Sequence, residues 1–406
     1  MNKRGRASTR GPRVGAYILS LIIGLVFLTA CSGPSTGATS EASVVATTTA
    51  ATGGSATGTT VATASSTLTS VATATSAGTP APTTASVSTA PAATTPAAGD
   101  STANYLDDRS SAEEVIYSYY SAINGKQYAR AYSYWASGTS SADLPPFAQF
   151  QQGYTTTRSV QVTIGSVSGG VGAGQLYYSV PVVLNSTTTD KGDQTFVGCY
   201  TLHLGNPAIQ TEPPYHPLAI QQADVAQVTG NASVKDMLAT ACKNQQGESP
   251  ILGTPSSDPN DIAATRYLDN RTSGIDEIRS YYNAINRKEY ARAYSYWESN
   301  VDSSQLPAFA AFQQGYAATA SVKLTLGSPV NGAGAGQLYT SVPATIVAKM
   351  TDGSTQTFVG CYTTHLAQPA IQSTPPFQPL GIQKAQVKKV ANGANTASLM
   401  AQACQP

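Results

Sequence analysis

The sequence has little charge and little histidine, and these two shortages exclude some classes of protein. Only 11% of the 406 residues are charged, and histidine occurs three times, which leaves few ligands for a histidine-rich metal site. Apart from the five basic residues that precede Val14, the chain carries 18 basic and 22 acidic residues, so it lacks the basic surface that nucleic-acid binding needs. We therefore expect no metal, no other cofactor and no nucleic-acid partner.

Long hydrophobic runs are also missing, and the N-terminus carries a short one instead. The basic segment 3–13 precedes the mostly apolar segment 14–27, which is shorter than the about 20 residues of a membrane-spanning helix. Leu28-Thr29-Ala30-Cys31 follows and resembles the bacterial lipobox, in which the Cys thiol takes lipid once the signal peptide is removed. A plain signal peptide or a single membrane anchor is the alternative. We expect a signal peptide over 1–30, and a lipid on Cys31 that anchors the exported protein to the outer face of a bacterial membrane.

Aromatic residues are absent from the next segment, which consists almost entirely of Ala, Thr, Ser, Gly, Val and Pro. Such a composition cannot bury enough apolar surface to offset the entropy lost on folding. Together with the lipidated cysteine, this segment is predicted to form a disordered linker over 31–102, a stalk between the membrane and the rest of the chain.

The remainder of the chain is a duplication. The segment 105–109 recurs at 267–271, and the same offset of 162 relates 128–135 to 290–297 and Cys242 to Cys404. No insertion is needed over about 138 positions, and over half of them are identical. Because such a repeat has the size of an ordinary domain, the sequence predicts one domain over 103–243, a linker over 244–264 and a second domain over 265–406.

Cysteine is scarce, and the duplication suggests how it is used. Apart from Cys31, the chain has Cys199 and Cys242 in the first copy and Cys361 and Cys404 in the second. An even number of cysteines in an exported chain favours disulfides. Since each copy brings one complete pair, we expect Cys199–Cys242 and Cys361–Cys404.

The periodicity of apolar residues changes once within each copy. Ile116, Tyr119, Tyr120 and Ile123 have helical spacing, and Ser111 with Glu114 resembles a capping box at the start of that helix. A second helical face, at 128–135, and a short helix at 147–157 are expected next. Strands are then expected at about 160–164, 175–184, 195–204 and 218–228, with a hairpin turn over 169–174 and a helix at 234–241. The fold class is therefore α+β, with N-terminal helices packed on an antiparallel sheet in each of two tandem domains.

This order of elements, and the helical pair at 116–135, resemble the nuclear transport factor 2-like, or SnoaL-like, superfamily. Gly198-Cys199-Tyr200-Thr201 is similar to a strand motif of that family. The resemblance covers about 105–230 and 267–392, and it implies a cone-shaped domain in which a curved sheet wraps the helices and leaves a cavity at its open end. Some members of the family are isomerases or dehydratases, and many bind ligands or partners.

An enzyme of this kind would need a general acid or base in the cavity. The candidates are His203 with Asp107, and His365 with Asp269, but a histidine on the sheet surface and a carboxylate with a local ion pair at a helix start explain them as well. No acidic residue falls on a probable cavity-facing strand position in both copies. We therefore predict no catalytic residues, and keep an isomerase- or dehydratase-type enzyme as the alternative function.

Tyrosine is the abundant aromatic, with 22 residues, and it combines a large contact area with a polar tip. Tyr128 and Tyr132, with Tyr290 and Tyr294 in the second copy, are the candidate ligand-binding residues, while Trp135 and Trp297 are expected in the core. Packing of this helix face on the sheet is the alternative. The predicted function is non-catalytic binding of a small ligand, a glycan or an envelope partner by a membrane-anchored extracytoplasmic lipoprotein.

Overall fold

The computed structural model describes residues 105–230, 232–242, 247–250, 252–254, 256–258 and 260–405. The predicted signal peptide, the lipidation site Cys31 and the predicted linker over 31–102 lie outside these residues. The described residues of both copies belong to one compact unit of the chain. The domain boundaries proposed from the sequence remain predictions.

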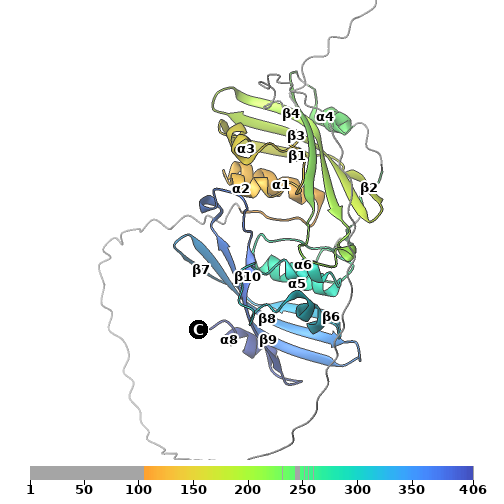
Figure 1. The fold of residues 1–406 in the computed structure, drawn as a ribbon, viewed down its shortest axis with the longest axis vertical. Coiled ribbons are helices and arrows are strands. Elements are labelled where there is room, and N and C mark those ends of the chain that lie inside the picture. The colour runs from red at the N-terminus through yellow and green to blue at the C-terminus, as the bar shows by residue number, and fades with distance from the viewer. Residues whose placement is uncertain are drawn as a thin grey trace, which may run out of the picture. The chain divides into compact units, whose positions relative to one another are not determined.

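Each copy is an α+β unit in which helices pack on a five-stranded antiparallel sheet, as the sequence predicts (Figure 1). The elements of the first copy are α1 (Ala112–Asn124), α2 (Tyr128–Tyr132), α3 (Phe147–Gly153), β1 (Thr157–Ile164), β2 (Ser168–Gly172), β3 (Gln175–Thr188), β4 (Gly192–Gly205), the 3-10 helix η1 (Pro207–Ile209), β5 (Ala219–Val228) and α4 (Val234–Ala241).

The second copy repeats this order of elements. They are α5 (Gly274–Asn286), α6 (Tyr290–Tyr294), α7 (Phe309–Gly315), β6 (Thr319–Leu326), β7 (Val330–Gly334), β8 (Gln337–Met350), β9 (Thr355–Ala367), the 3-10 helix η2 (Pro369–Ile371), β10 (Gly381–Val390) and α8 (Thr396–Gln402).

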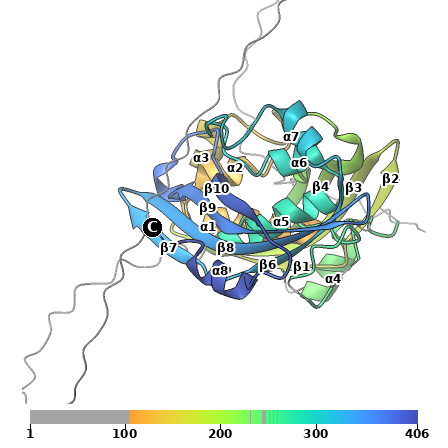
Figure 2. The same ribbon diagram turned by 90° about the horizontal axis from the view of Figure 1, so that it is seen from below.

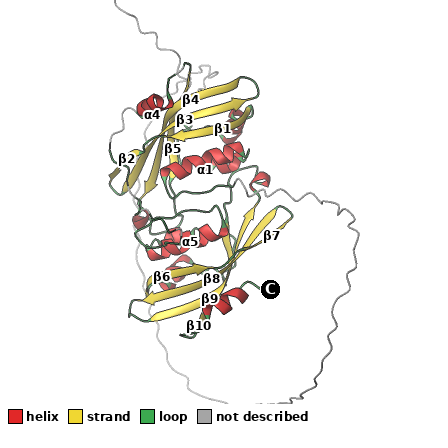
Figure 3. Ribbon diagram, turned by 180° about the vertical axis from the view of Figure 1, so that it is seen from behind, coloured by secondary structure: helices red, strands yellow, loops and turns green. Residues whose placement is uncertain are grey.

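The long strand β3 organises the first sheet, whose strand order is β1-β3-β4-β5. One half of β3 pairs with β1 and the other half with β2, so Ile164 lies opposite Val182 and Gly172 lies opposite Gln175. The same arrangement holds for β8 in the second sheet, with the order β10-β9-β8-β6. Figure 3 shows α1 and α5 each lying along the sheet of its own copy.

The first helix of each copy begins where the sequence predicts. The Ser111 hydroxyl accepts a hydrogen bond from the Glu114 backbone N–H, and Ser273 does the same for Asp276 in the second copy. The helix buries its apolar face, including Ile116 and Ile123, against the sheet. That burial is the main source of its stability, because a helix of 13 residues is marginal by itself.

The second helix is shorter than the sequence predicts. It ends at Tyr132 instead of continuing to Trp135. The chain then runs beside β5, where the Ile220 backbone N–H donates to the Tyr134 carbonyl and the Ala136 N–H donates to the Ile220 carbonyl, both at 2.8 Å. Since helical spacing does not apply beyond Tyr132, the direction of the Trp135 ring is set by this bridge to the sheet.

The predicted hairpin turn over 169–174 is smaller than expected. Residues Ser168–Gly172 form the strand β2, and only Ala173 and Gly174 make the turn into β3. Both have positive φ angles, 49° and 75°. A two-residue turn with two positive φ angles suits the twist of an antiparallel hairpin, and glycine adopts such angles at little cost.

Both predicted disulfides are present, Cys199–Cys242 and Cys361–Cys404. Residues 198, 200, 202 and 204 of β4 are buried, so Cys199 lies on the opposite face of the strand and holds α4 there, away from α1 (Figure 2). Closing a loop of this length stabilises a fold by about 4 kcal/mol in the chain-entropy model. Disulfides of this kind are typical of proteins in oxidising, extracytoplasmic compartments.

None of the described helices is both long enough and apolar enough to cross a membrane.

The segments that precede the first helix of each copy bond to one another within the compact unit. The Arg109 N–H donates to the Asp269 carbonyl and the Arg271 N–H donates to the Asp107 carbonyl, both at 2.7 Å. Asp108 and Asn270 form the bridge between them. The repeated motif at 105–109 and 267–271 is therefore a structural link between the copies.

Candidate functional site

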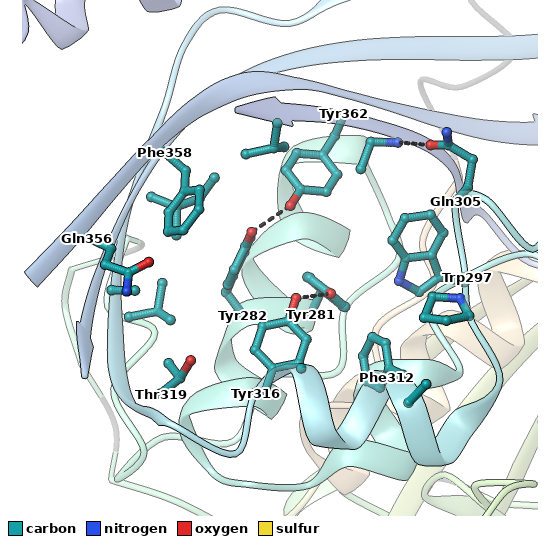
Figure 4. A pocket seen from close by; sticks show the side chains of 18 of the residues that line it. Tyr281, Tyr282, Trp297, Gln305, Phe312, Tyr316, Thr319, Gln356, Phe358 and Tyr362 are labelled. Atoms are coloured by element: carbon teal, nitrogen blue, oxygen red, sulfur yellow. Dashed lines mark hydrogen bonds between the residues drawn. The ribbon is translucent and has the colours of Figure 1, made fainter. Parts of the chain in front are cut away.

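The second copy contains a cavity of about 480 Å³ between its helices and its sheet. Its wall comes from α5, α7 and the segment after α6 on one side and from β6, β8, β9 and β10 on the other. Aromatic side chains dominate it (Figure 4). They are Tyr281, Tyr282, Trp297, Phe312, Tyr316, Phe358 and Tyr362.

Two pairs of tyrosine hydroxyls contribute polar groups to this wall, in addition to Gln305, Thr319 and Gln356. Tyr281 and Tyr316 share a hydrogen bond of 2.6 Å, and Tyr282 and Tyr362 share one of 2.5 Å. In each pair one hydroxyl donates and the other accepts, so one hydroxyl hydrogen per pair is left for another acceptor. Figure 4 shows both pairs beside the cavity. The cavity can therefore donate hydrogen bonds to an acceptor atom of a ligand.

The indole of Trp297 adds a third polar group to this wall. Its Nε1 is buried and makes no hydrogen bond of regular geometry within the described residues, and its proximity to the Tyr281 hydroxyl offsets part of the rise in the pKa of that group. The ring lies edge-on to Tyr281, with ring centroids 6.3 Å apart. A buried indole N–H usually has a partner, so this one is a further donor for a ligand.

Charged groups do not contribute to the described wall of this cavity, since no Asp, Glu, His, Lys or Arg is among the residues that line it. Burial raises the pKa of Tyr281 and Tyr282 well above its ordinary value, and neighbouring tyrosines add to the shift. Burial likewise raises the pKa of Tyr316. These hydroxyls therefore stay protonated at neutral pH, and act as hydrogen-bond donors rather than as bases.

The first copy divides the same space into two cavities, of about 180 and 400 Å³. Tyr119 and Tyr154 share a hydrogen bond of 2.8 Å, and Tyr120 and Tyr200 share one of 2.7 Å, so the hydroxyl pairs are retained. The strand residues at the open end are more polar, because Ser186 and Thr188 replace the Ala348 and Met350 of the second copy. The two copies thus share the tyrosine donors and much of the apolar wall, whereas Asp143, Asp190 and Lys191 also line the cavities of the first copy.

The tyrosines chosen from the sequence do not line these aromatic cavities. Tyr128, Tyr132 and Tyr290 are absent from the described walls of the cavities in both copies, and Tyr294 lines a different cavity. The Tyr132 hydroxyl instead donates to the Pro145 carbonyl, and its ring packs against Phe147 and Phe150. Their proposed role in ligand binding remains an untested prediction.

The expectation for the tryptophans is corrected by the structure. Trp135 and Trp297 are only partly buried, and each lines the aromatic cavity of its copy. The expectation was wrong because it continued the helical spacing of 128–132 through residue 135. Tyr119 and Tyr120 could have been recognised from the sequence as candidates, since both lie on the predicted apolar face of α1, which packs on the sheet.

The histidines and aspartates weighed as catalytic groups do not meet. His203 Nε2 bonds to Gln175 Oε1 at 2.6 Å, and its ring lies against Tyr177 on the face of β4 away from the core. Asp107 is buried, accepts hydrogen bonds from Tyr105 and Tyr134, and lies 3.8 Å from Arg109. This ion pair agrees with the structural interpretation, but the helix cap itself is Ser111.

The corresponding histidine of the second copy has a carboxylate partner that the sequence did not suggest. His365 Nδ1 bonds to Glu298 Oε1, not to Asp269. Asp269 instead accepts a hydrogen bond of 2.8 Å from the Tyr296 hydroxyl. In the first copy, Asp107 accepts a hydrogen bond from the equivalent tyrosine. Within the described residues, no group of three or more His, Cys, Asp or Glu side chains is placed to hold a metal ion.

Comparison with known proteins returns no relatives: no protein-family model, no curated protein and no solved structure matches this chain.

Proposed function

We propose that the chain is a lipid-anchored, extracytoplasmic lipoprotein whose two nuclear transport factor 2-like domains bind small, largely apolar ligands in the aromatic cavities. The observation that carries this proposal is the wall of the second cavity, which combines aromatic rings with spare hydroxyl and indole donors and has no charged side chain among its described residues. A preformed apolar cavity with a few convergent polar groups is the usual form of a small-molecule site.

The donors define the ligand further. Two hydroxyl hydrogens and one indole N–H suit a molecule with an acceptor oxygen on an apolar body. A ligand with an uncompensated charge would lose hydration without gaining a partner of opposite charge in the wall. For the second cavity, binding is favoured over the isomerase or dehydratase alternative because no carboxylate or histidine is among the described residues of its wall and its tyrosines remain protonated.

The order of the elements supports the family resemblance, with three helices, then a five-stranded antiparallel sheet, and a cavity enclosed between them. The two disulfides are in keeping with export, and lipid on Cys31 would hold the domains at the membrane surface. Loss of fatty-acid labelling in Cys31→Ala, together with accumulation of the unprocessed precursor, tests the anchor.

Tryptophan fluorescence tests the cavities directly, because the chain has two tryptophans and each lines one of them. Nile red is a suitable probe, since it is a neutral aromatic molecule with a carbonyl acceptor. We expect saturable quenching of both tryptophans, separated by using Trp135→Phe and Trp297→Phe. Native mass spectrometry of the purified protein would in parallel reveal a co-purified ligand.

The hydroxyl donors are tested by the double variant Tyr281→Phe/Tyr316→Phe, which keeps both rings and removes both oxygens of one pair, because either hydroxyl alone would still have a hydrogen to donate. We expect the affinity of the second copy to fall by about fivefold, as the loss of one net hydrogen bond of about 1 kcal/mol implies. Tyr290→Phe is the matched control, because Tyr290 stacks on Tyr316 but does not line the cavity. Quenching that is unsaturable, or a loss caused by Tyr290→Phe and not by the double variant, would contradict the proposal.

A further inference from the structure

Another cavity, of about 630 Å³, is not used by the proposed function. The segment after α6, the end of β9 and the loop before β10 of the second copy contribute to it, and residues 213–215 of the first copy complete its wall. Glu298, His365 and Arg271 lie in its wall, together with the rings of Tyr294 and Trp297. This wall therefore contains ionisable side chains, which are missing from the described wall of the aromatic cavity on the other side of Trp297. Trp297 lines both cavities.

A fixed histidine–carboxylate pair lies in this wall. His365 Nδ1 bonds to Glu298 Oε1, while Nε2 bonds to Gln337 Oε1 at 2.7 Å. The imidazole also stacks on Tyr339, with ring centroids 4.7 Å apart and planes 24° apart. The imidazole is therefore held by three neighbours. Because Nε2 is occupied by Gln337, the pair positions the second oxygen of Glu298 and does not expose a free base.

The duplication shows that the fold does not require this pair. The residue that corresponds to Glu298 in the first copy is Ala136, and the one that corresponds to Gly381 is Ala219. A Cβ on Gly381 would lie 2.8 Å from Cγ of Glu298, so the glycine makes room for the longer side chain. Two contacting positions differ together, and the first copy folds without either change. We infer that the pair serves a site rather than the stability of the fold.

The wall contains charges of both signs. Arg271 supplies a guanidinium, and Glu298, which is bonded to His365, supplies a carboxylate. Ser299 and Asn300, which also line the cavity, are exposed, and their side chains make no hydrogen bond within the described part of the chain. The wall thus offers uncharged donors and acceptors, a carboxylate, a guanidinium and aromatic rings.

We propose that this cavity binds a short, uncharged saccharide. A sugar presents hydroxyls that both donate and accept, which suits a carboxylate oxygen, a hydroxyl and an amide together. The apolar C–H face of a sugar ring can lie on the Tyr294 or Trp297 ring. A cationic ligand would meet the like charge of Arg271 in this wall, and an anionic ligand would meet that of Glu298.

The test uses the full-length chain in detergent, applied to an array of uncharged mono- to tetrasaccharides, followed by calorimetric titration of the saccharide retained. The double variant Glu298→Ala/Gly381→Ala gives the second copy the residues of the first copy at both positions. We expect it to fold as the parent does and to lose at least tenfold in affinity. Asn300→Ala, at an exposed position, should lower the affinity by several-fold without changing the melting temperature.

Tyr316→Phe separates this site from the aromatic cavity, because Tyr316 lines only the latter of the two. Saccharide binding should be unchanged in that variant even if the aromatic cavity proves to bind nothing. The proposal is overturned if the array retains no saccharide, if the folded double variant binds as the parent does, or if titration with choline or acetate gives binding where saccharides give none.

Discussion

The two copies have nearly the same fold and differ in how they bury charge. Arg130 and Arg292 are equivalent and both are fully buried. In the second copy Arg292 Nε bonds to Glu289 at 2.6 Å, whereas the first copy has Gln127 at that position and leaves both Arg130 Nε and Gln127 Oε1 without a partner. The same backbone therefore tolerates two electrostatic solutions, and the duplication provides each copy with a control for the other.

A second difference runs the other way. Val115 of the first copy is replaced by Glu277, which is fully buried and has no hydrogen-bond partner on either oxygen within the described residues. Arg271, at 3.6 Å, is its nearest counter-charge. Burial raises the pKa of Glu277 to about 8, in spite of the opposing effect of Arg271. At this position the second copy is destabilised by the desolvation of the Glu277 carboxyl group, and the first copy is not.

The largest effect is expected from Glu289→Gln, which gives the second copy the residue of the first. Breaking a buried ion pair by removing one partner costs about 3–5 kcal/mol. Arg287 would lose its carboxylate partner at the same time, since its Nε bonds to Glu289 at 2.7 Å, and would keep only its bonds to backbone carbonyls. We expect a lower midpoint of denaturant unfolding for the second copy. Hydrogen exchange of the amides of α5 and α6 is the measurement that reports on this copy.

The reverse substitution in the first copy, Gln127→Glu, is the complementary experiment. It should stabilise the first copy, because it supplies a carboxylate to Arg130. An unchanged stability in both variants would show that the difference between Gln127 and Glu289 is neutral, and that the pair does not hold Arg292 in place.

Glu277→Val should have the next largest effect, and its size should depend on pH. The folded pKa of about 8 lies above the ordinary value of 4.5, so the folded protein binds the extra proton between these values. The free energy of unfolding of the parent should therefore fall as the pH rises from about 4.5 to 8.

The valine variant removes this slope and should be more stable than the parent at pH 8. Thermal melting from pH 5 to 8 provides the measurement. Val115→Ile in the first copy, which introduces no ionisable group, is the control for packing changes. If the melting temperatures of the parent and the valine variant changed with pH in the same way over this range, the assignment of the pH dependence to Glu277 would be contradicted.

The smallest effect on stability is expected from grafting the histidine–carboxylate pair onto the first copy. Ala136→Glu with Ala219→Gly places a carboxylate where His203 can reach it, by analogy with His365 and Glu298. An opposite charge favours the charged imidazole, so the His203 resonance in an NMR titration should move to a higher pKa. If His203 titrates as it does in the parent, the two sites differ by more than these two residues.

Much of the fold could be predicted from the sequence because the signals were local. The capping serine Ser111 and the face of α1 follow from the spacing of residues within one helix, and the disulfide pairing follows from the duplication. The strands are longer than predicted: β3 extends to Thr188, since pairing with β1 continues beyond the last alternating apolar residue.

The candidate site could be predicted only in part. The abundance of tyrosine was visible, but which tyrosines face the cavity was not, since that depends on segments distant in the chain. Tyr120 meets Tyr200, which lies 80 residues away. Trp135 is aimed at the cavity by a bridge to Ile220 that no local pattern encodes.

The sequence by itself determined the two α+β copies, their helix starts and their disulfides, because periodicity, capping and repetition act over short distances or compare one copy with the other. Only the tertiary structure decided which side chains meet. It paired Glu298 with His365 across 67 positions, left Glu277 buried without a hydrogen bond, and enclosed the tyrosine hydroxyls in a cavity. These outcomes depend on the packing of the helices against the sheet. That packing brings together residues that are far apart in the sequence, and their sequence separation does not predict their contact.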